Sequence, residues 1–562
     1  MRDIHLNHIS EQPLLNTGGS LGTIFILMQM IRNQLVIIAC FFTNFVFAQA
    51  TGGRYTEHPD SIATHKVVLD NQSKIISWIT PQSAAYDRFL RDRWNFIIKG
   101  VPDCPGPAPR SDYPQYFFYC AYKEQKMIPD TWMNDVGEKI PNWFESARLY
   151  YQYTGDRRAL DIAAKMAMYS IDHGTSPDSF AWPDFPYTTT NAGDILFRGF
   201  TDSKKLVLHE VQVDHAGDMG FTYYKLFLYT GDEKFKQAAI HVADALATHA
   251  RTGSASQSVW PYRVVMSDGR ITAQYGANWM GCYALLDHLA RAKLGHVDAY
   301  QSALVKVREF ILKFPMQTGY WTDGHTDTDV NSETYKSNMS ASNATLYLFD
   351  HPGFDAEYKT DIPRLIKWTE ENFVHHSGPG EPSVQWGANI VGEQDGFLPK
   401  MDYQTARYGA ECARWYAISG DPSYKEKAYR SLNWVTYCSD SNGLAFESPL
   451  SHGVTSWWSD CYGEGPRMFY HALAAVPEWA PPGENHILYS KEILKNVTYG
   501  KNKLSYYAAD RDGTEFLRVS FKPSSIKANG VAMKTGLEIK SLGNGDYYLA
   551  IRRSSAGSIT IE

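Results

Sequence analysis

Several sequence signatures are missing from this chain of 562 residues, and each absence excludes a class of function. The chain has no glycine-rich phosphate-binding loop, no dinucleotide-binding fingerprint and no Gly-x-Ser-x-Gly nucleophile motif. Basic residues are not in excess, since the formal net charge is -7 and the pI is about 6.2. A nucleic-acid-binding protein normally presents a basic face, so we expect no nucleic-acid partner.

The chain also lacks a hydrophobic run long enough to suit a membrane span. Residues 30–50, MIRNQLVIIACFFTNFVFAQA, have a basic start, a short apolar run and the small-residue site Ala48–Ala50. This pattern is typical of a secretory signal peptide. We therefore expect translation to start at Met30 and the mature chain to begin at Thr51, in the periplasm or at the cell surface. A lipoprotein signal around Cys40 is the alternative.

Cysteine is scarce, with 7 residues in the whole chain. No Cys-x-x-Cys pair and no cysteine spaced with histidine for a zinc site is present, so we expect neither a metal nor a cofactor. Export permits disulfides. Cys104 and Cys120, in a stretch rich in proline and tyrosine, are the candidate pair.

Aromatic residues, by contrast, are abundant. They make up 14% of the chain, with 15 Trp and 36 Tyr. Packing in a core explains part of this number. A ligand cleft lined by flat aromatic rings, of the kind that covers sugar faces, would explain the excess.

A helical hairpin recurs along the chain. Residues 153–156 (YTGD), 229–232 (YTGD) and 419–421 (SGD) each separate two segments whose apolar residues repeat with a helical period. The glycine ends one helix and the aspartate caps the next. Weaker copies begin near Tyr275, Met339 and Trp457. About six hairpins predict a mainly α fold, an (α/α)6 toroid of helical hairpins.

The pattern changes after Pro481–Gly483. From there, apolar residues alternate with a period of two around Asp-Gly and Asn-Gly-Asp turns, which predicts a small C-terminal β-domain. We expect it to pack against the toroid or to bind glycan. The predicted division is an upstream segment plus signal peptide at 1–50, an N-terminal extension at 51–80, the toroid catalytic domain at 81–480 and a β-sandwich-like domain at 484–562.

A cluster of titratable residues stands just before one predicted inner helix. It is the segment 209–218, HEVQVDHAGD. Counting back the same number of residues from the glycine of each hairpin gives equivalent positions in two repeats. Asp214 is equivalent to Tyr403, and Asp218 is equivalent to Arg407. Inner helices of a toroid run parallel, so their N-termini gather at one mouth, where helix dipoles favour anions. The long loops that lead to this mouth are of a length that is usually functional.

The candidate catalytic residues are His209, Glu210, Asp214, His215 and Tyr403. Glu210 and Asp214 stand four residues apart and share a face if this segment is helical, which suits an acid and base pair. The alternatives are structural: Asp214 is also a natural helix cap, and both histidines are equally suited to structural hydrogen bonds.

The candidate substrate-binding residues lie in the loops and helix starts around the same mouth. They are Arg198, Arg263, Tyr275, Asn278, Trp279, Trp386, Asn389, Glu393, Arg407, Trp457 and Trp458. Arginines in such loops suit carboxylate or sulfate groups. Each tryptophan alone is more often a core residue, and only their concentration near one mouth favours a role in binding.

Several of these blocks carry a resemblance. The signal peptide, the YTGD hairpins, NAGDILFRGF…HEVQVDHAGDMG, WPYRV and WGANIVGEQDG resemble secreted (α/α)6-toroid carbohydrate-active enzymes of Bacteroidota. More narrowly, they are similar to β-glucuronidases of glycoside hydrolase family 154 and to the ulvan oligosaccharide dehydratase of marine flavobacteria. The resemblance covers roughly residues 80–480. It implies a substrate that contains uronic acid, and it transfers no established catalytic set to this sequence.

Two reactions are compatible with these candidate residues. Elimination of water from a terminal glucuronate requires a cation on the carboxylate, a base and an acid, for which Arg, Tyr and His are suited. Hydrolysis requires two carboxyl groups, such as Glu210 or Asp214 with Glu393 or Asp395. We expect elimination from a uronate oligosaccharide, with a β-glucuronidase-like hydrolase as the alternative. A non-catalytic surface glycan-binding protein is the rival from another class, and the sequence leaves the oligomeric state open.

Overall fold

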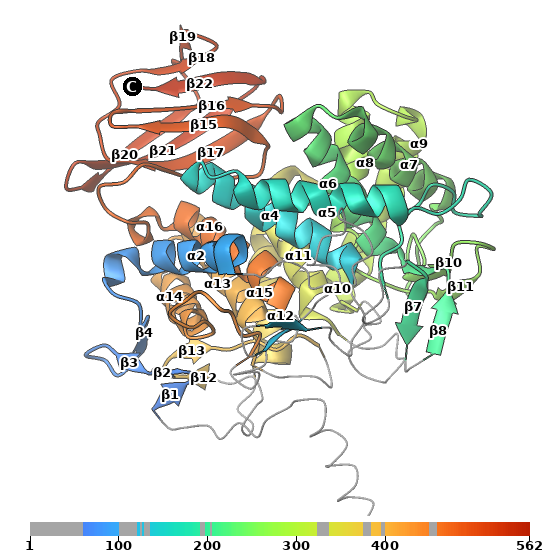
Figure 1. The fold of residues 1–562 in the computed structure, drawn as a ribbon, viewed down its shortest axis with the longest axis horizontal. Coiled ribbons are helices and arrows are strands. Elements are labelled where there is room, and N and C mark those ends of the chain that lie inside the picture. The colour runs from blue at the N-terminus through green and yellow to red at the C-terminus, as the bar shows by residue number, and fades with distance from the viewer. Residues whose placement is uncertain are drawn as a thin grey trace, which may run out of the picture. The chain divides into compact units, whose positions relative to one another are not determined.

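The computed structural model describes the chain from Asp60 onward with interruptions (Figure 1). The described residues are 60–100, 121–123, 126–128, 135–190, 197–202, 205–322, 336–374, 384–394, 400–448 and 458–562. The expected signal peptide, the disulfide between Cys104 and Cys120, and the role given to Trp457 lie outside these residues. They stay predictions.

Helices in two layers form a closed ring. The inner helices are α4 (Val136–Thr154), α6 (Val213–Thr230), α8 (Met280–Ala292), α11 (Asn338–Asp350), α13 (Asp402–Ser419), and the successive α15 (Trp458–Gly463) and α16 (Gly465–Ala475). Each inner helix contacts the next, and α16 contacts α4. Their outer partners are α5 (Arg158–His173), α7 (Glu233–His249), α9 (Val297–Lys313), α12 (Tyr358–Phe373) and α14 (Pro422–Thr436). This arrangement confirms the predicted toroid of helical hairpins.

The sixth outer helix comes from the N-terminal part of the chain. Helix α2 (Ala85–Asn95) packs against α16, with the ring centroids of Phe89 and Phe469 4.5 Å apart. Arg93 of α2 is fully buried and donates from Nη2 to Oδ2 of Asp402 at 2.8 Å. A buried pair of this kind stabilises the fold only while both partners are present. It therefore ties the N-terminal helix α2 to the inner helix α13.

The repeated hairpin motif ends helices as its sequence predicts. Gly155, Gly231 and Gly420 take left-handed φ angles of 78°, 77° and 73°, which a residue without a Cβ adopts at little cost. The carboxylates of Asp232 and Asp421 each accept the backbone N–H two residues further on, at 2.9 Å. Both are N-caps of the outer helix that follows.

Short elements complete this part of the chain. The other helical segments are η1 (Gln82–Ala84), η2 (Phe96–Gly100), α10 (Pro315–Thr318), η3 (Pro352–Phe354) and η5 (Pro477–Trp479). The two-stranded sheets are β1 (Ser61–Ile62) with β2 (His65–Lys66), β3 (Val68–Leu69) with β4 (Ile75–Ile76), β5 (Ala121–Lys123) with β6 (Lys126–Ile128), β7 (Gly199–Asp202) with β8 (Lys205–Leu208), and β12 (Val384–Gln385) with β13 (Ala388–Asn389).

A three-stranded antiparallel sheet stands directly before α6. It has the order β11 (Ile271–Ala273), β10 (Arg263–Val265), β9 (Glu210–Gln212). Glu210 is therefore in a strand, whereas Asp214 is in the first turn of α6. The two carboxylates do not share a helix face, which corrects that expectation: pairing with β10 holds this segment extended.

The C-terminal segment forms two antiparallel sheets. One has the order β14 (His486–Ser490), β17 (Gly513–Val519), β21 (Asp546–Arg553), β20 (Leu537–Gly543). The other has the order β15 (Leu494–Gly500), β16 (Lys503–Ala508), β22 (Gly557–Ile561), β18 (Ile526–Ala528), β19 (Val531–Ala532). Buried Leu517 and Leu549 belong to the first sheet and buried Leu504 and Ile559 to the second. The two sheets contact each other where the hydroxyl of Tyr506 donates to a Glu515 carboxylate oxygen at 3.1 Å.

The connection from β14 to β15 closes the ring at the C-terminal end of its inner helices. Arg148 of α4 donates from Nη1 to the carbonyl oxygen of Ser490 at 2.8 Å. Gln152, one turn further on, donates to the carbonyl oxygen of Glu492 at 2.9 Å. The hydroxyl of Tyr489 donates to a carboxylate oxygen of Asp350 in α11 at 2.5 Å. The β-domain thus forms the floor of the ring.

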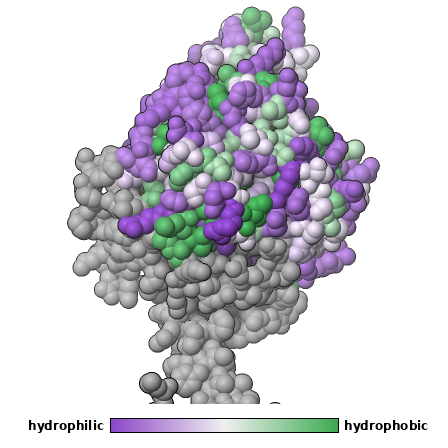
Figure 2. All heavy atoms as spheres, turned by 90° about the vertical axis from the view of Figure 1, so that its right-hand side faces the viewer, coloured by the Kyte–Doolittle hydropathy of each residue, from purple (hydrophilic) through white to green (hydrophobic). Residues whose placement is uncertain are grey.

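Within the described part of the chain, none of the helices combines the length and the hydropathy that crossing a bilayer requires. The face drawn in Figure 2 mixes hydrophilic and hydrophobic side chains over the described residues. Isolated exposed hydrophobic residues such as Val531 are ordinary at a protein surface.

Candidate active site

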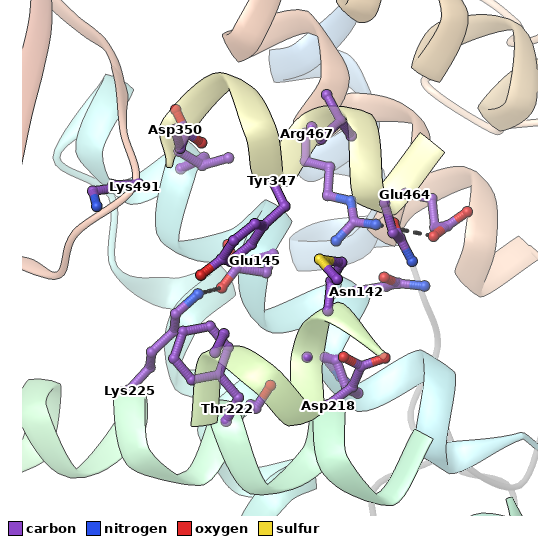
Figure 3. Close-up of a pocket in the computed structure, with 18 of the residues that line it drawn as sticks. Asn142, Glu145, Asp218, Thr222, Lys225, Tyr347, Asp350, Glu464, Arg467 and Lys491 are labelled. Atoms are coloured by element: carbon purple, nitrogen blue, oxygen red, sulfur yellow. Dashed lines mark hydrogen bonds and ion pairs between the residues drawn. The ribbon is translucent and has the colours of Figure 1, made fainter. Parts of the chain in front are cut away.

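A cavity of about 210 Å³ lies inside the ring. Its lining includes Glu138, Asn142, Glu145 and Arg148 from α4; His215, Asp218, Thr222 and Lys225 from α6; Gly281 and His288 from α8; Asn343, Tyr347 and Asp350 from α11; Arg407 from α13; and Glu464 and Arg467 at the start of α16. On one helix these residues recur three, four or seven positions apart, so they share the inward face. Figure 3 shows them converging from separate helices.

A chain of hydrogen bonds connects the inner helices near their N-termini. Asn278 donates from Nδ2 to Oδ2 of Asp214 at 3.1 Å, and Asn343 donates from Nδ2 to Oδ1 of Asn278 at 2.9 Å. Arg407 donates from Nη1 to Oδ1 of Asn343 at 2.8 Å, and its guanidinium also pairs with the carboxylate of Glu464. These contacts fix the orientation of Arg407 in the cavity.

Two arginines share the carboxylate of Glu464. Its Oε1 accepts from Nη2 of Arg467 at 3.0 Å as well as from Arg407. Burial acts to raise the pKa of Glu464, but the two guanidinium groups outweigh burial and the pKa is lowered. Nε of Arg467 has no hydrogen-bond partner within the described residues. Two cations with one carboxylate leave a surplus positive charge at the cavity wall.

Asp218 is one of two acids in the cavity lining, with Glu492, whose pKa is raised toward or above neutrality. Burial, followed by the charge of Asp214 one helical turn away, raises the pKa of Asp218 to about 7. Its place depends on Gly281 of α8, where an added Cβ would lie 1.5 Å from Oδ1 of Asp218. A carboxyl group with a pKa near the working pH is suited to proton transfer.

His215 precedes Asp218 by one turn of α6 and is buried, whereas Asp218 is partly exposed to the cavity. Its Nδ1 lies 3.3 Å from Oδ1 of Asp135. Burial acts to lower the pKa of His215, but the nearby carboxylates of Asp135 and Asp214 raise it well above its ordinary value. The imidazole is therefore cationic at neutral pH and carries protons on both nitrogens.

The cavity is cationic, although the chain as a whole has a net charge of -7. Six lining residues are basic and four are carboxylates apart from Asp218 and Glu492: Arg148, His215, Lys225, Arg407, Arg467 and Lys491 against Glu138, Glu145, Asp350 and Glu464. Asp218, with a pKa of about 7, adds a fifth negative charge only when it is ionised. Burial raises the pKa of Glu492, which also lines the cavity, to about 8. Burial lowers the pKa values of His288, His351 and His471, so these rings are neutral. An anionic ligand matches this surface.

Four of the residues singled out from the sequence meet at this cavity. His215 and Arg407 line it, while Asp214 and Asn278 belong to the hydrogen-bond chain that supports it. The repeat register had matched Asp218 with Arg407, and both residues line this cavity. Their catalytic and binding roles stay predictions.

His209, Glu210 and Arg263 lie together just before α6 but are absent from the cavity lining. His209 has a φ of 62° and its Nδ1 lies 2.5 Å from the hydroxyl of Tyr187. The guanidinium of Arg263 stacks 4.1 Å above the ring of Phe200. The sheet β9–β10 holds these side chains beside the N-terminal end of the ring.

Tyr403 and Glu393 form a separate buried pair. The hydroxyl of Tyr403 donates to Oε1 of Glu393 at 3.1 Å, in the first turn of α13. Neither residue lines the cavity. Asn389 lies elsewhere, since its Nδ2 donates to the hydroxyl of Tyr408 at 2.7 Å. The expectation of one rim shared by all candidates is thus met only in part, because α13 presents Arg407 and not Tyr403 to the cavity.

The aromatic candidates do not line the cavity either. Trp279 is fully buried and donates from Nε1 to the carbonyl oxygen of Gly276 at 2.6 Å. Tyr275 is also buried, with its hydroxyl 3.3 Å from the carbonyl oxygen of Tyr320. Trp386 occupies the β12–β13 turn with a φ of 48°.

Two candidates remain, one arginine and one tryptophan. Arg198 is exposed beside β7, and Trp458 begins α15. Arg198 is not part of the cavity lining. In the described part of the chain, arginine and acidic side chains line this site, and no tryptophan does.

Several lining residues were not singled out from the sequence. They are Glu138, Asn142, Glu145, Asp218, Lys225, Glu464 and Arg467. A signal for Asp218 was present, since the repeat register set it against Arg407. The α4 residues 138, 142 and 145 have the spacing of one helix face. From the sequence alone, a polar face of this kind is equally typical of a helix that faces solvent.

A His/Asp/Glu cluster away from the cavity is the one group in the described chain close enough to hold a metal ion. It consists of Asp87, Glu484 and His486. Arg91 already pairs with Asp87 at 2.9 Å and approaches Glu484 at 3.7 Å. His486 bonds through Nδ1 to the carbonyl oxygen of Tyr153 at 2.8 Å. These contacts describe a structural junction between α2, α4 and β14.

No family model and no curated protein matches this sequence. Among solved structures, cellobiose 2-epimerase from Spirochaeta thermophila is 9% identical, with a TM-score of 0.45 over 68% of this chain and 95% of that chain. An unsaturated glucuronyl hydrolase specific for heparin is 10% identical, with a TM-score of 0.42 over 70% and 98%. A family 76 glycoside hydrolase from a bovine Bacteroides thetaiotaomicron strain is 13% identical, with a TM-score of 0.43 over 70% and 78%. Likeness at this level carries no inference about activity.

Proposed function

We propose that this protein is a carbohydrate-active enzyme that eliminates water from a terminal glucuronate of an oligosaccharide, leaving an unsaturated uronate. One observation carries the proposal. Asp218, with a pKa of about 7, lines the same cavity as the two arginines that share Glu464. A proton acceptor and a carboxylate-binding cation side by side are what elimination next to a carboxylate needs.

The reaction follows from the roles these groups can take. Arg467, with Arg407 behind it, binds the C6 carboxylate and makes the C5 proton more acidic. Asp218 removes that proton, and the C5–H electron pair forms the C4=C5 double bond as the C4–O bond breaks. The imidazolium of His215 donates a proton to the departing hydroxyl, which leaves as water.

Charge supports a uronate over a neutral sugar. The cations of the lining outnumber its ionised carboxylates. Guanidinium groups bind carboxylates through two parallel hydrogen bonds, and in a confined site such bonds are stronger than in water. A neutral glycan would leave the surplus charge of Arg467 uncompensated.

Hydrolysis is the second candidate, and one observation favours it. Asp218 and Glu464 line one cavity with pKa values shifted in opposite directions, raised for the first and lowered for the second. Such a pair is the usual sign of an acid and a base in a glycosidase. In that reaction Asp218 would act in its protonated form.

The mass of the product decides between these chemistries. The protein is incubated with uronate-terminated oligosaccharides from ulvan and the products are measured by mass spectrometry. Loss of one water without shortening, together with new ultraviolet absorbance, supports elimination. Gain of one water with two fragments supports hydrolysis. Unchanged masses across the series, with binding retained, would leave a non-catalytic glycan-binding protein.

We also propose export to the periplasm or cell surface. The support is the sequence of residues 30–50 alone. N-terminal sequencing of the protein recovered from its natural source tests this, and Thr51 is the expected first residue.

A further inference from the structure

A second charge cluster lines the cavity two helical turns beyond Asp218 on α6. Glu145 of α4 accepts from Nζ of Lys225 on α6 at 2.5 Å through Oε1. Its Oε2 accepts from Nη2 of Arg148 at 2.5 Å. Figure 3 shows Lys225 and Glu145 joined below Tyr347. As around Glu464, two cations share one carboxylate.

The charge of this cluster is settled by its surroundings. Burial acts to raise the pKa of Glu145, but Arg148 and Lys225 outweigh it and the pKa is lowered, so the carboxylate stays ionised. Glu492, which faces both cations, has a pKa raised to about 8 and adds little negative charge at neutral pH. Burial lowers the pKa of Lys225, while the carboxylate of Glu145 acts to raise it and favours the charged ammonium. With Lys225 and Arg148 both charged, the cluster has a net positive charge.

Lys225 has hydrogen-bonding capacity to spare. An ammonium group has three donors. Glu145 takes one, and the ammonium also lies 4.1 Å from the centre of the Phe221 ring. Nothing else in the described part of the chain accepts from it. Its remaining donors are available to a ligand in the cavity.

A hydroxyl acceptor lies close to the cluster. His288 bonds through Nδ1 to the carbonyl oxygen of Ala284 at 2.8 Å, and burial keeps its ring neutral. In that tautomer Nε2 is an acceptor. His288 and Lys225 line the same cavity, so a hydroxyl donor and an anion can be bound together.

The two clusters stand at two levels of one cavity. Asp218 and Lys225 are seven residues apart on α6, which corresponds to about 10 Å along the helix axis. Glu138 and Glu145 have the same separation on α4. The two clusters are thus two helical turns apart, which leaves room for a second sugar unit beside the reacting one.

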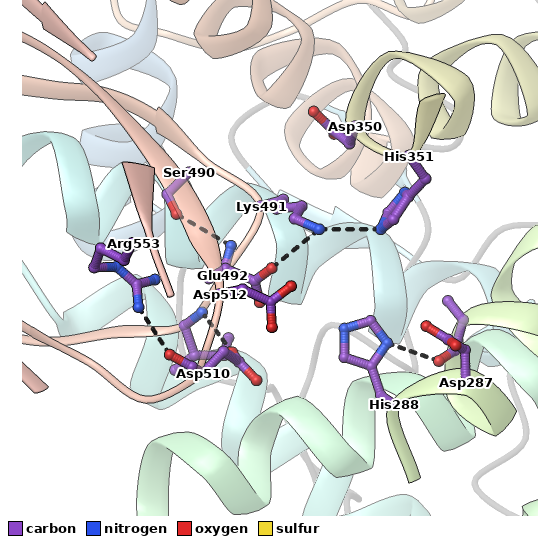
Figure 4. A network of polar contacts seen from close by, with 12 residues as sticks. Asp287, His288, Asp350, His351, Ser490, Lys491, Glu492, Asp510, Asp512 and Arg553 are labelled. Atoms are coloured by element: carbon purple, nitrogen blue, oxygen red, sulfur yellow. Dashed lines mark hydrogen bonds and ion pairs between the residues drawn. The ribbon is translucent and has the colours of Figure 1, made fainter. Parts of the chain in front are cut away.

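The floor of the cavity, at the end of this second level, comes from the β-domain. Lys491 lies 3.3 Å from Glu492 and 3.2 Å from Nε2 of His351 (Figure 4). Asp350 beside them is neutralised by Arg414 at 2.7 Å. A ligand anion at Lys225 would therefore lie among mostly buried charged groups, where charge-assisted hydrogen bonds are stronger than in water.

We propose that Lys225 and Arg148 form a second anion subsite, which binds a carboxylate or sulfate ester on the sugar next to the reacting uronate. The substrate class is then an oligosaccharide with two anionic groups on separate sugar units. This inference rests on the proposed function for the identity of the first group, whereas the binding preference that tests it does not require turnover.

The test compares ligands in the full-length protein, with Asp218→Asn as host so that no ligand is consumed. Calorimetry measures the affinity of glucuronate linked to a neutral sugar, to a second glucuronate and to a sulfated sugar. We expect either dianionic ligand to bind at least about tenfold more tightly than the monoanionic one, since a hydrogen bond to a charged group has that effect. The ratio of the two dianionic affinities then shows whether the subsite prefers a carboxylate or a sulfate ester.

Three variants in that host localise the effect. Lys225→Met should reduce the preference to within about twofold while the monoanionic ligand binds as before. Lys225→Arg keeps the charge and should keep the preference. Lys501→Met, at an exposed lysine without an ion pair in the described chain, should change nothing.

Equal affinities for monoanionic and dianionic ligands in the host protein would overturn the subsite, whether or not Lys225→Met folds. So would an equal loss for both ligand classes in a folded Lys225→Met protein. The two proposals fail separately. If no uronate oligosaccharide is chemically altered, the proposed function falls, while a dianionic preference that depends on Lys225 would still stand.

Discussion

The two levels of the cavity shift the pKa of a carboxyl group in opposite directions. Asp218 at the first level has a neighbouring carboxylate, Asp214, and burial raises its pKa to about 7. Glu145 at the second level is held between two cations, which outweigh burial and lower its pKa. Removal from water acts alike on both groups, so the adjacent charges decide the outcome. The first level can exchange a proton near neutrality, and the second keeps a fixed charge.

Replacing the titrating acid should have the largest effect. Asp218→Asn removes the proton acceptor with little change in shape, and we expect kcat to fall by about 10²–10⁴-fold, the range for one acid-base group. Steady-state kinetics on the uronate oligosaccharide checks this. Asp178→Asn, at an exposed aspartate, is the matched control. Full activity of Asp218→Asn would remove the proposed role of the first level.

Breaking the fixed charge should affect stability more than chemistry. Glu145→Gln leaves Arg148 and Lys225 facing each other, and we expect a loss of about 3–5 kcal/mol in the free energy of unfolding at pH 7. Urea denaturation measures it, with the exposed Glu309→Gln as control.

The same variant has a pH dependence with a fixed sign. The folded pKa of Glu145 is lowered, so its contribution is complete above the unfolded value of about 4.3 and is lost as pH falls below it. The stability difference between Glu145→Gln and the unaltered protein should therefore shrink in acid. A constant difference from pH 7 to pH 3 would contradict a permanently ionised Glu145.

The second cation on Glu464 should affect uronate recognition. Arg467→Met removes the guanidinium that bears an unpaired Nε, and we expect kcat/KM to fall about 10–100-fold for a uronate, from the loss of charge-assisted hydrogen bonds. The same oligosaccharide with its carboxyl group reduced to an alcohol should be equally poor with both proteins. Arg552→Met, at an exposed arginine, controls for charge. An unchanged uronate preference would place carboxylate recognition elsewhere.

The smallest expected effect is a shift in the pH profile. If Asp218 is the base of an elimination, kcat/KM rises as pH passes about 7, and if it is the acid of a hydrolysis, kcat/KM falls there. Asp214→Asn removes the neighbouring negative charge and should move this limb toward acid by on the order of one pH unit. A limb that stays in place would mean that another group titrates.

Much of the fold was predictable because its signals are local. The glycines at 155, 231 and 420 stop a helix within one turn, and Asp232 and Asp421 begin the next through their own backbone. The period-two pattern after residue 483 likewise reflects neighbours along one strand. Repetition of these signals was enough to predict a ring.

The site was predicted only where the repeats carried the register. The register pointed to the turns that hold Asp214 and Arg407, whereas nothing in the sequence singled out Glu138, Asn142 and Glu145. Tryptophans read as a sugar platform included Trp279, which is buried in the core. The polarity of a side chain indicates that it lies outside the apolar core. It does not show whether the side chain faces bulk water or an enclosed polar cavity.

The sequence by itself therefore determined where helices start and stop, and that successive hairpins are equivalent, because caps and hydrophobic periodicity act over a few residues. Only the tertiary structure decided which polar stripe faces inward, because that depends on how six helix pairs close on one another. It also decided the pKa values, since Asp218 and Glu145 differ through charges supplied by other turns and other helices. A carboxyl group can therefore act as a proton acceptor or stay permanently ionised, depending on neighbouring charges that are distant in the sequence.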